Sequence, residues 1–177
     1  AVFFAALTLL GKTEGIDRPA IATIVNINST PVLLLDSGAN ADCRPEHLVQ
    51  FAQLGNIYAT EVFGLESPRV ALLNMGGEES KGNRLAREAY QVLKQAKINF
   101  VGNIEGHDIP RGASDIIVTD GFTGNIVLKT LEGLGETILK LRNHGQTFSH
   151  AYNVRGRELL VEVGLGALAK GLDYRQF

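Results

Sequence analysis

The sequence predicts an α/β fold, in which helices cover both faces of a mostly parallel sheet. Two observations support this prediction. Short segments that are apolar throughout, such as 32–35 and 70–73, alternate along the chain with longer segments of helical period. Strands that lack polar alternation are buried on both faces, and helices between consecutive strands force those strands to run parallel. The order of the strands in the sheet does not follow from the sequence.

The first strand–turn–helix unit begins with the apolar strand 32–35. A helix is predicted from Pro45, because proline suits the first turn of a helix. Gly55 is expected to end this helix, since glycine commonly follows the last helical residue. The apolar face of the helix has three members, which are Leu48, Phe51 and Ala52.

The second unit contains the most regular helical pattern in the chain. An apolar run ends at Asn74, a Gly-rich charged loop follows, and a helix is predicted to begin near Asn83. One apolar stripe along this helix contains Leu85, Ala86, Ala89, Val92, Leu93 and Ala96. Two further strands are predicted, one in 98–103 and one within 114–125. The helix after the last strand is expected to have an inner face of Leu128, Leu131, Leu134, Ile138 and Leu141.

The two ends of the chain are less regular. The apolar run 1–10 is shorter than the roughly 20 residues of a membrane span, and it lacks the features of a signal peptide. We expect it to be a buried helix whose beginning is missing, in a chain that is a fragment of a longer protein. We therefore expect an α/β core over residues 1–142. Residues 143–177 are expected to form a helical or irregular segment that faces a dimer partner or a membrane.

Composition excludes several classes of function. The formal net charge is −2, so no polyanion-binding surface and no nucleic-acid partner are expected. The single cysteine, Cys43, excludes an internal disulfide framework and a zinc site made of cysteines. Low cysteine content favours a reducing, cytoplasmic location.

Three turns are expected at the carboxyl ends of strands, where ligands collect in open parallel sheets. They span residues 36–40, 76–83 and 120–125, and each combines glycines with small polar side chains. Two of them lead into helix N-termini, whose free N–H groups and dipole favour an anion. The pattern predicts a phosphate-type site. The turn residues expected to contact this ligand are Asp36, Gly38, Asn40, Gly82, Asn83, Asp120, Gly121 and Gly124.

Three side chains near these turns have two interpretations each. Lys81 either holds a phosphate or a developing oxyanion, or it is a solvated lysine that balances Glu78 and Glu79. Asn125 either donates its amide to the same ligand or caps the helix that follows. Lys129 lies four residues after Asn125 on the same helical face, so it either reinforces the site or is an ordinary surface lysine.

Asp36 and Asp120 would repel a phosphate unless a metal intervened. We therefore expect their carboxylates to hold turn N–H groups or a lysine, with Mg²⁺ binding the weaker alternative. No metal ligand set and no cofactor are predicted. Cys43 is expected to be a small packed side chain, although its turn could lower the pKa of a thiol. The four histidines lack metal-ligand spacing and are expected on the surface or in turns: His47, His107, His144 and His150.

Four stretches of sequence resemble a known family: GIDRPAIAT, LLLDSGANADCRPEHLVQFAQLG, RVALLNMGGEESKGN and INFVGNIEGHDIPRGASDIIVTDGFTGNIVLKTLEG. They are similar to the acyl-carrier-protein:phosphate acyltransferases of bacterial phospholipid synthesis, the PlsX family, over about residues 1–141. The resemblance implies a fold akin to isopropylmalate dehydrogenases and phosphotransacetylases. It also implies a homodimer that associates peripherally with the membrane.

The same resemblance implies transfer of a fatty acyl group from acyl carrier protein to inorganic phosphate. By motif, the functional lysine and asparagine of the family correspond to Lys81 in SKGN and Asn125 in DGFTGN. His107 departs from the family, which often has a more basic residue there. The Gly-rich turn before the first helix and the family's segment beyond Phe177 are both absent, so the chain is about half of a family member.

The implied reaction agrees with the residues themselves. Attack of phosphate on a thioester requires a cation and oriented donors, and it requires no covalent nucleophile on the protein. We expect the Gly-rich loop to be flexible so that Lys81 can reach a small dianion. The alternatives are a phosphotransacetylase-like protein that uses a short acyl coenzyme A, and a non-enzymatic scaffold that binds carrier protein or membrane through the apolar stretch 159–172. A nicotinamide dehydrogenase is disfavoured because the dinucleotide fingerprint is missing.

Overall fold

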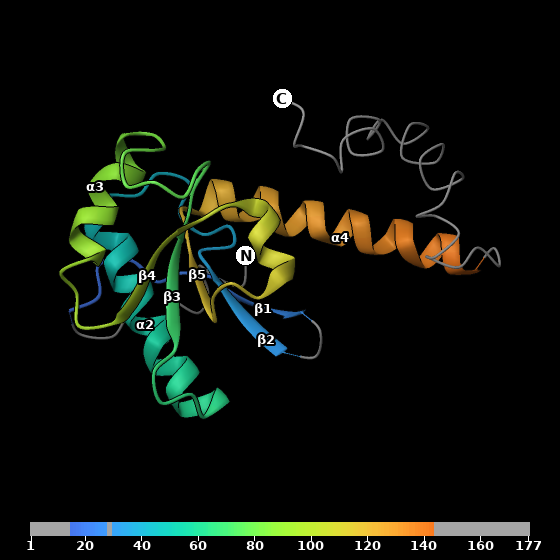
Figure 1. Ribbon diagram of the computed structural model, residues 1–177, viewed down its shortest axis with the longest axis horizontal. Coiled ribbons are helices and arrows are strands. Elements are labelled where there is room, and N and C mark those ends of the chain that lie inside the picture. Colours follow the sequence, from blue (N-terminus) through green and yellow to red (C-terminus); the bar gives the residue numbers. More distant parts are fainter. Residues whose placement is uncertain (1–14, 28–29, 144–177) are drawn as a thin grey trace. The chain divides into compact units, whose positions relative to one another are not determined.

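The structure is a computed structural model that describes residues 15–27 and 30–143 (Figure 1). The chain divides into two compact units, residues 1–128 and residues 129–177. The predictions for the apolar run 1–10, for the segment after residue 143, and for His144 and His150 concern residues outside the described part.

The first unit is built on a five-stranded sheet with the strand order β1-β2-β5-β3-β4. The strands are β1 (Ala22–Ile27), β2 (Thr30–Leu35), β3 (Arg69–Leu73), β4 (Asn99–Ile104) and β5 (Ile116–Val118). β1 pairs with β2 antiparallel, and the other three pairs are parallel. The prediction of an α/β fold with a mostly parallel sheet is therefore confirmed. β1 was not predicted, because it is a half-exposed edge strand without a continuous apolar run.

Helices follow three of the strands. They are α2 (Pro45–Phe63), α3 (Arg84–Leu93) and α4 (Gly121–Asn143), and a short 3₁₀ helix, η1 (Gly106–Arg111), lies between β4 and β5. α2 and α3 pack against each other and against the sheet (Figure 1). The predicted helix starts at Pro45 and near Asn83 are confirmed. Asn83 is the N-cap of α3, where its side-chain Oδ1 accepts a hydrogen bond of 2.9 Å from the Ala86 N–H.

The predicted end of α2 at Gly55 is wrong. The helix continues to Phe63, and Gly64, in the left-handed conformation with φ 70°, caps it. Gly55 is buried instead at the point where α2 crosses the sheet. A Cβ atom at Gly55 would lie 2.6 Å from Leu35 Cδ1 and 2.9 Å from Ile116 Cγ2. Glycine here serves the close approach of helix and sheet rather than termination.

The core strands are buried on both faces, as their unbroken apolar sequences predict. Side chains of β2, β3 and β5 that belong to the core cluster with α2 and α3 are Leu33, Leu35, Val70, Leu72, Ile116 and Val118. The alternate side chains of the same strands are also at most 2% exposed: Val32, Leu34, Ala71 and Ile117. Full burial of each such side chain contributes about 1.5–3 kcal/mol to folding.

Two predicted helical stripes are only partly correct. In α3, Ala89 and Leu93 are fully buried, but Val92 is 39% exposed and Ala96 lies beyond the end of the helix. In the second unit, Leu134 and Ile138 of α4 are 38% and 41% exposed, so the predicted buried inner face is wrong for these two residues. Helical periodicity indicates which residues share a stripe, but it does not indicate what covers the stripe.

None of the helices within the described residues has the length and apolar character that crossing a membrane requires.

Candidate functional site

The pairing register places three turns at one edge of the sheet. Leu35 of β2 is paired with Val118 of β5, which is in turn paired with Leu72 of β3. Because these three strands are parallel, their carboxyl ends lie side by side, and the turns that follow them begin in one row. The expectation that the three turns share the carboxyl edge is therefore confirmed.

Asp36 shapes the first turn. Its fully buried carboxylate accepts hydrogen bonds through Oδ1 from the N–H groups of Gly38 (3.0 Å) and Ala39 (2.9 Å). Its Oδ2 accepts hydrogen bonds of 2.8 Å from both the backbone N–H and the side-chain amide of Asn40. The expectation that Asp36 holds turn N–H groups is confirmed. The amide nitrogen of Asn40 also donates to the Pro19 carbonyl, so this side chain is used within the protein.

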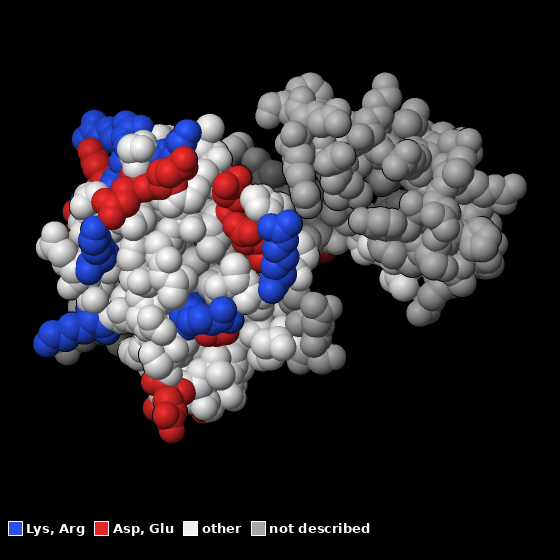
Figure 2. All heavy atoms as spheres, viewed as in Figure 1, with Lys and Arg blue, Asp and Glu red and all other residues white. Residues whose placement is uncertain are grey.

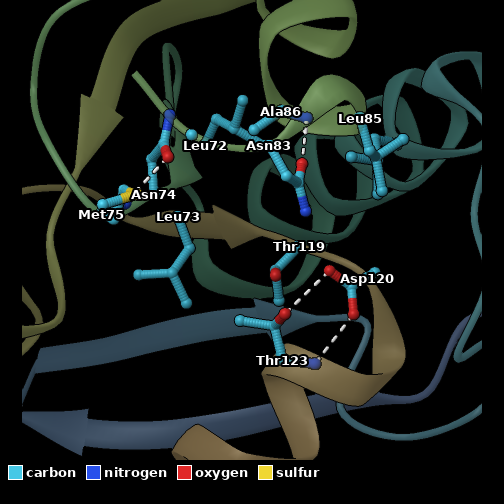
Figure 3. A pocket seen from close by; sticks show the side chains of 12 residues that line it. Leu72, Leu73, Asn74, Met75, Asn83, Leu85, Ala86, Thr119, Asp120 and Thr123 are labelled. Carbon is cyan, nitrogen blue, oxygen red and sulfur yellow. Dashed lines mark hydrogen bonds between the residues drawn. The ribbon is translucent and has the colours of Figure 1, made fainter.

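Asp120 caps α4 at the third turn. Its carboxylate accepts hydrogen bonds of 2.8 Å from both the backbone N–H and the hydroxyl of Thr123 (Figure 3). This confirms that Asp120, like Asp36, holds backbone donors. Because α4 begins at Gly121, Asn125 lies inside the helix, and the interpretation of Asn125 as a helix cap is wrong.

The first and third turns are joined to each other through their backbones. The Gly121 N–H donates to the Asn40 carbonyl at 2.7 Å, and a Cβ at Gly121 would lie only 2.7 Å from the Asn40 nitrogen. A Cβ at Gly124 would overlap the Asp36 carbonyl oxygen. Both glycines therefore permit a close backbone approach that no other residue allows.

Asn125 is exposed and lies beside the first turn, because its Oδ1 is 3.5 Å from where a Cβ of Gly38 would stand.

The second turn is held in place by Asn74, which follows β3. The Asn74 Nδ2 donates a hydrogen bond of 3.1 Å to the carbonyl oxygen of Lys81, and the Asn74 Oδ1 accepts one of 2.8 Å from the Met75 N–H. Gly82 has a φ of 91° and packs against this same amide, so a Cβ there would overlap the Asn74 Oδ1. The side chain of Asn74 thus occupies the inside of the turn.

Two further contacts fix the outer part of the second turn. Asn103 of β4 donates from Nδ2 to the Glu78 carbonyl at 2.9 Å, and Lys94 forms an ion pair of 2.7 Å with Glu79. Hydrogen bonding to Lys94 holds the pKa of Glu79 below its ordinary value. These contacts anchor the backbone of the turn at Glu78 and the side chain of Glu79. They also leave Lys81 without an ion pair among the described residues, so it does not balance Glu79.

A cavity of about 320 Å³ lies between the second and third turns (Figure 3). It is lined by Leu48, Leu72, Leu73, Asn74, Met75, Gly82, Asn83, Leu85, Ala86, Thr119, Asp120 and Thr123. The structure thus brings three of the predicted site residues to one cavity, which are Gly82, Asn83 and Asp120. The side chains of Lys81 and Asn125 do not line it, although both belong to turns that do.

Three polar residues of this lining were missed by the sequence analysis: Asn74, Thr119 and Thr123. Asn74 and Thr119 are the first residues after β3 and β5, so their position directly after a strand was the available signal.

Cys43 is packed as predicted, whereas His47 is not where the sequence analysis placed it. Burial, followed by the negative charges of Asp120 and Asp36, raises the pKa of the Cys43 thiol to about 11, as suits a packed side chain. The prediction that His47 is on the surface is wrong, because it is buried in the first turn of α2. Burial, with the nearby charges of Arg18 and Arg44, lowers the pKa of His47. His107 is exposed in η1, as expected.

Within the described residues, no group of three or more carboxylate, imidazole or thiol side chains is arranged so that it could hold a metal ion. In the second unit, the ammonium group of Lys129 forms an ion pair of 2.7 Å with Glu132. Figure 2 shows acidic and basic residues interspersed on the face in view, with no continuous basic patch.

Comparison with known proteins agrees with this architecture. Residues 1–176 match the family described as fatty acid synthesis protein. A phosphate acyltransferase of Dehalococcoides mccartyi is 56% identical over 177 residues, which cover 99% of this chain and 51% of that protein. A phosphate acyltransferase of Desulforamulus reducens is 46% identical over 172 residues, which cover 97% of this chain and 51% of that protein. The chain therefore spans about half the length of these relatives.

Solved structures are similar at the level of the fold. EutD phosphotransacetylase from Staphylococcus aureus matches with a TM-score of 0.59 and 18% identity, over 74% of this chain and 46% of that one. A phosphotransacetylase from Streptococcus pyogenes matches with a TM-score of 0.55 and 19% identity, over 70% of this chain and 44% of that one. The fold is thus of the phosphotransacetylase type, and by sequence the chain belongs to the fatty acid synthesis protein family, with relatives named phosphate acyltransferase.

Proposed function

We propose that the protein transfers a fatty acyl group from acyl carrier protein to inorganic phosphate, forming an acyl phosphate for phospholipid synthesis. The observation that carries the proposal is the row of three turns at the carboxyl edge of the sheet, two of which lead into the N-termini of α3 and α4. Such an edge is where parallel sheets bind ligands, and helix N-termini favour anions. The names of the relatives supply the reaction class.

Lys81 and Asn125 are proposed to act on the phosphate. Lys81 is exposed and has no ion pair within the described residues, so its charge is available to an anion. The hydrogen bond from Asn74 holds the Lys81 backbone in a turn that borders the cavity, which supports a role for the side chain there. Asn125 is exposed beside the glycine turn 36–40 and can donate from its amide. In this proposal phosphate binds along the turns, and the Asp36 carboxylate only shapes the backbone there.

The reaction balances without a cofactor. A lone pair on a phosphate oxygen forms a C–O bond to the thioester carbonyl carbon, while the carbonyl π electrons move to oxygen and give a tetrahedral oxyanion. Collapse of this intermediate restores the carbonyl and breaks the C–S bond. The sulfur leaves with the electron pair as a thiolate, which takes up a proton to become the thiol of acyl carrier protein. Positioned donors and a cation lower the barrier by stabilising the oxyanion.

The proposed assembly is a cytoplasmic homodimer that associates peripherally with the membrane. Phe122, in the first turn of α4, is 63% exposed, and a large apolar side chain so exposed supports a surface that takes part in association. Light scattering of the purified protein tests the dimer. Co-sedimentation with anionic phospholipid vesicles tests the membrane association, and a protein that stays in the supernatant contradicts it.

The function is tested by incubating the purified protein with fatty acyl-carrier protein and phosphate and measuring acyl phosphate. A matched reaction with acetyl coenzyme A separates this function from that of a phosphotransacetylase. Lys81→Ala is expected to lower kcat about 10²-fold, because a charge that stabilises the transition state is lost. Lys97→Ala is the control, since Lys97 is an exposed lysine that precedes β4 at the amino edge of the sheet, opposite to the turns. Equal turnover by the two variants would remove Lys81 from the mechanism.

A further inference from the structure

The cavity between the second and third turns does not suit phosphate. Its floor is apolar, and it is formed by Leu48, Leu72 and Leu85. Asp120 is the one charged residue among those that line it, and its charge is negative. A dianion placed there would lose hydration and face a carboxylate without a compensating cation. The lining therefore suits a ligand group that is uncharged when it binds and partly apolar.

Asn83 presents a hydrogen-bond donor to this cavity. Its Oδ1 accepts the hydrogen bond from Ala86 that caps α3, and this bond fixes which end of the amide faces the helix. The amide nitrogen consequently points the other way, toward Thr119 (Figure 3). In residues 15–27 and 30–143 no group accepts a hydrogen bond from this nitrogen.

Thr119 supplies a second polar group on the opposite wall. The residue is only 2% exposed, yet it lines the cavity, and its hydroxyl has no hydrogen-bond partner among the described residues. The Thr119 oxygen is not one of the fully buried polar atoms that lack a partner in the described residues, which are Asn103 Oδ1 and Ser114 Oγ. Its hydroxyl is therefore open to the cavity and can donate to a group bound there. In Figure 3 the Thr119 hydroxyl and the Asn83 amide nitrogen face the same space from β5 and α3.

We propose that this cavity binds the thioester end of the acyl donor. The carbonyl oxygen accepts hydrogen bonds from the Asn83 amide nitrogen and the Thr119 hydroxyl, since a carbonyl has two lone pairs. The first methylene groups of the acyl chain lie on Leu48, Leu72 and Leu85. The same two donors stabilise the oxyanion when phosphate attacks. This inference rests on the proposed function, but it assigns the cavity to the acyl substrate and leaves phosphate to the turn residues outside it.

The test uses variants that remove one donor and preserve the fold. Asn83→Ser retains an N-cap acceptor, because serine caps a helix about as well as asparagine. Thr119→Val removes the hydroxyl and keeps the branched shape. Each variant is expected to lower kcat/KM for fatty acyl-carrier protein about 10²-fold, while KM for phosphate is unchanged. Asn99→Ser is the control, because the amide of Asn99 bonds the Ser67 carbonyl at the amino end of β4.

A binding measurement separates this inference from the proposed function. A non-cleavable acyl-pantetheine thioether, in which a methylene group separates the sulfur from a ketone carbonyl, is titrated calorimetrically into the wild type and both variants. Binding that weakens several-fold in both variants, with unchanged unfolding temperatures, supports the inference. Full activity and unchanged thioether affinity in the variants overturn it and leave the acyltransferase function standing. A wild type that forms no acyl phosphate from any thioester overturns the function, and the inference with it.

Discussion

The side chain of Asn74 holds the backbone of Lys81, because its Nδ2 donates a hydrogen bond of 3.1 Å to the Lys81 carbonyl oxygen. The other end of the same amide accepts a hydrogen bond of 2.8 Å from the Met75 N–H. Both polar atoms of Asn74 are therefore used to join the end of β3 to the turn that precedes α3. The backbone position of Lys81, the proposed phosphate-binding residue, therefore depends on Asn74, an uncharged residue seven positions earlier in the sequence.

Asn74→Ala is expected to lower activity more than it lowers stability. Loss of the hydrogen bonds destabilises the protein by about 1 kcal/mol. The freed turn no longer holds Lys81, so kcat is expected to fall about tenfold or more. The measurements are acyl phosphate formation and urea unfolding.

The matched control for this variant is Asn99→Ala. Its Nδ2 also donates a hydrogen bond of 3.1 Å to a backbone carbonyl, that of Ser67, but at the opposite end of the sheet. The two variants are expected to lose similar stability, and only Asn74→Ala loses activity. Equal activity in the two would show that the turn needs no support from Asn74.

Gly124→Ala is expected to destabilise the protein by more than about 2 kcal/mol. The added Cβ would overlap the Asp36 carbonyl oxygen, which is backbone and cannot move without opening the first turn. Gly133→Ala on the same helix is the control, because nothing lies within 4 Å of a Cβ there. That substitution is expected to stabilise the helix by up to about 1 kcal/mol. The measurement is the melting temperature of each variant in thermal unfolding. Similar melting temperatures for the two variants would contradict the close packing at Gly124.

The elements of the fold were predictable where local chemistry decides them. Pro45 and Asn83 mark helix starts because a fixed φ and a side-chain acceptor act within one turn of the chain. The helix end predicted at Gly55 was wrong because this glycine is required by tertiary packing. Leu35 and Ile116, from two separate strands, lie against it. The edge strand β1 was missed for a related reason, since its stability comes from pairing with β2 rather than from its own sequence pattern.

The candidate site was predictable only as far as the rule for parallel sheets extends. That rule places the turns after β2, β3 and β5 at one edge, and the register bears it out. The direction of each side chain depends on contacts that are distant in sequence. Thr119 follows β5 directly, but the cavity that it lines is completed by residues distant in sequence, such as Asn74 and Asn83. The contacts of the loop with Asn103 and Lys94 were not predictable, because both residues lie well beyond the loop in the sequence.

Asp115 and Arg69 are expected to make stability depend on pH in the acidic range. Burial raises the pKa of Asp115, but hydrogen bonds from the side chain and backbone of Arg69, and its charge, bring the net pKa below the ordinary value of 3.8. A carboxylate with a lowered pKa stabilises the folded state above its unfolded pKa, and this stability is lost as the pH falls through the folded pKa. Asp115→Asn should therefore cost about 1 kcal/mol at pH 7 and progressively less below pH ~3.8.

Urea unfolding of the wild type and Asp115→Asn at pH 7 and at the lowest pH that keeps both folded measures this difference. Asp42→Asn is the control, because Asp42 is an exposed aspartate that contributes only its backbone carbonyl to the hydrogen bond from Arg18. A difference between wild type and Asp115→Asn that stays constant with pH would mean that the charge of Asp115 is unimportant.

The reactivity of Cys43 can be used to probe the surroundings of the first turn. Its thiol donates a hydrogen bond of 3.5 Å to the Asn40 carbonyl. Burial, and then the negative charges of Asp120 and Asp36, raise the pKa of this thiol. With a pKa of about 11, only ~0.1% of the thiol is ionised at pH 8, compared with roughly a tenth at the ordinary value of 9.0. Labelling of the native protein by iodoacetamide is therefore expected to be far slower than labelling in urea, and its rate should still rise above pH 10. Asp120→Asn removes one of the charges that raise the pKa, so native labelling at pH 8 should become faster. Because Cys43 is the only cysteine in the sequence, the fraction of labelled protein gives the extent of reaction at this residue alone. A native rate that levels off near pH 9 would mean that neither burial nor the two aspartates raise the pKa of the thiol.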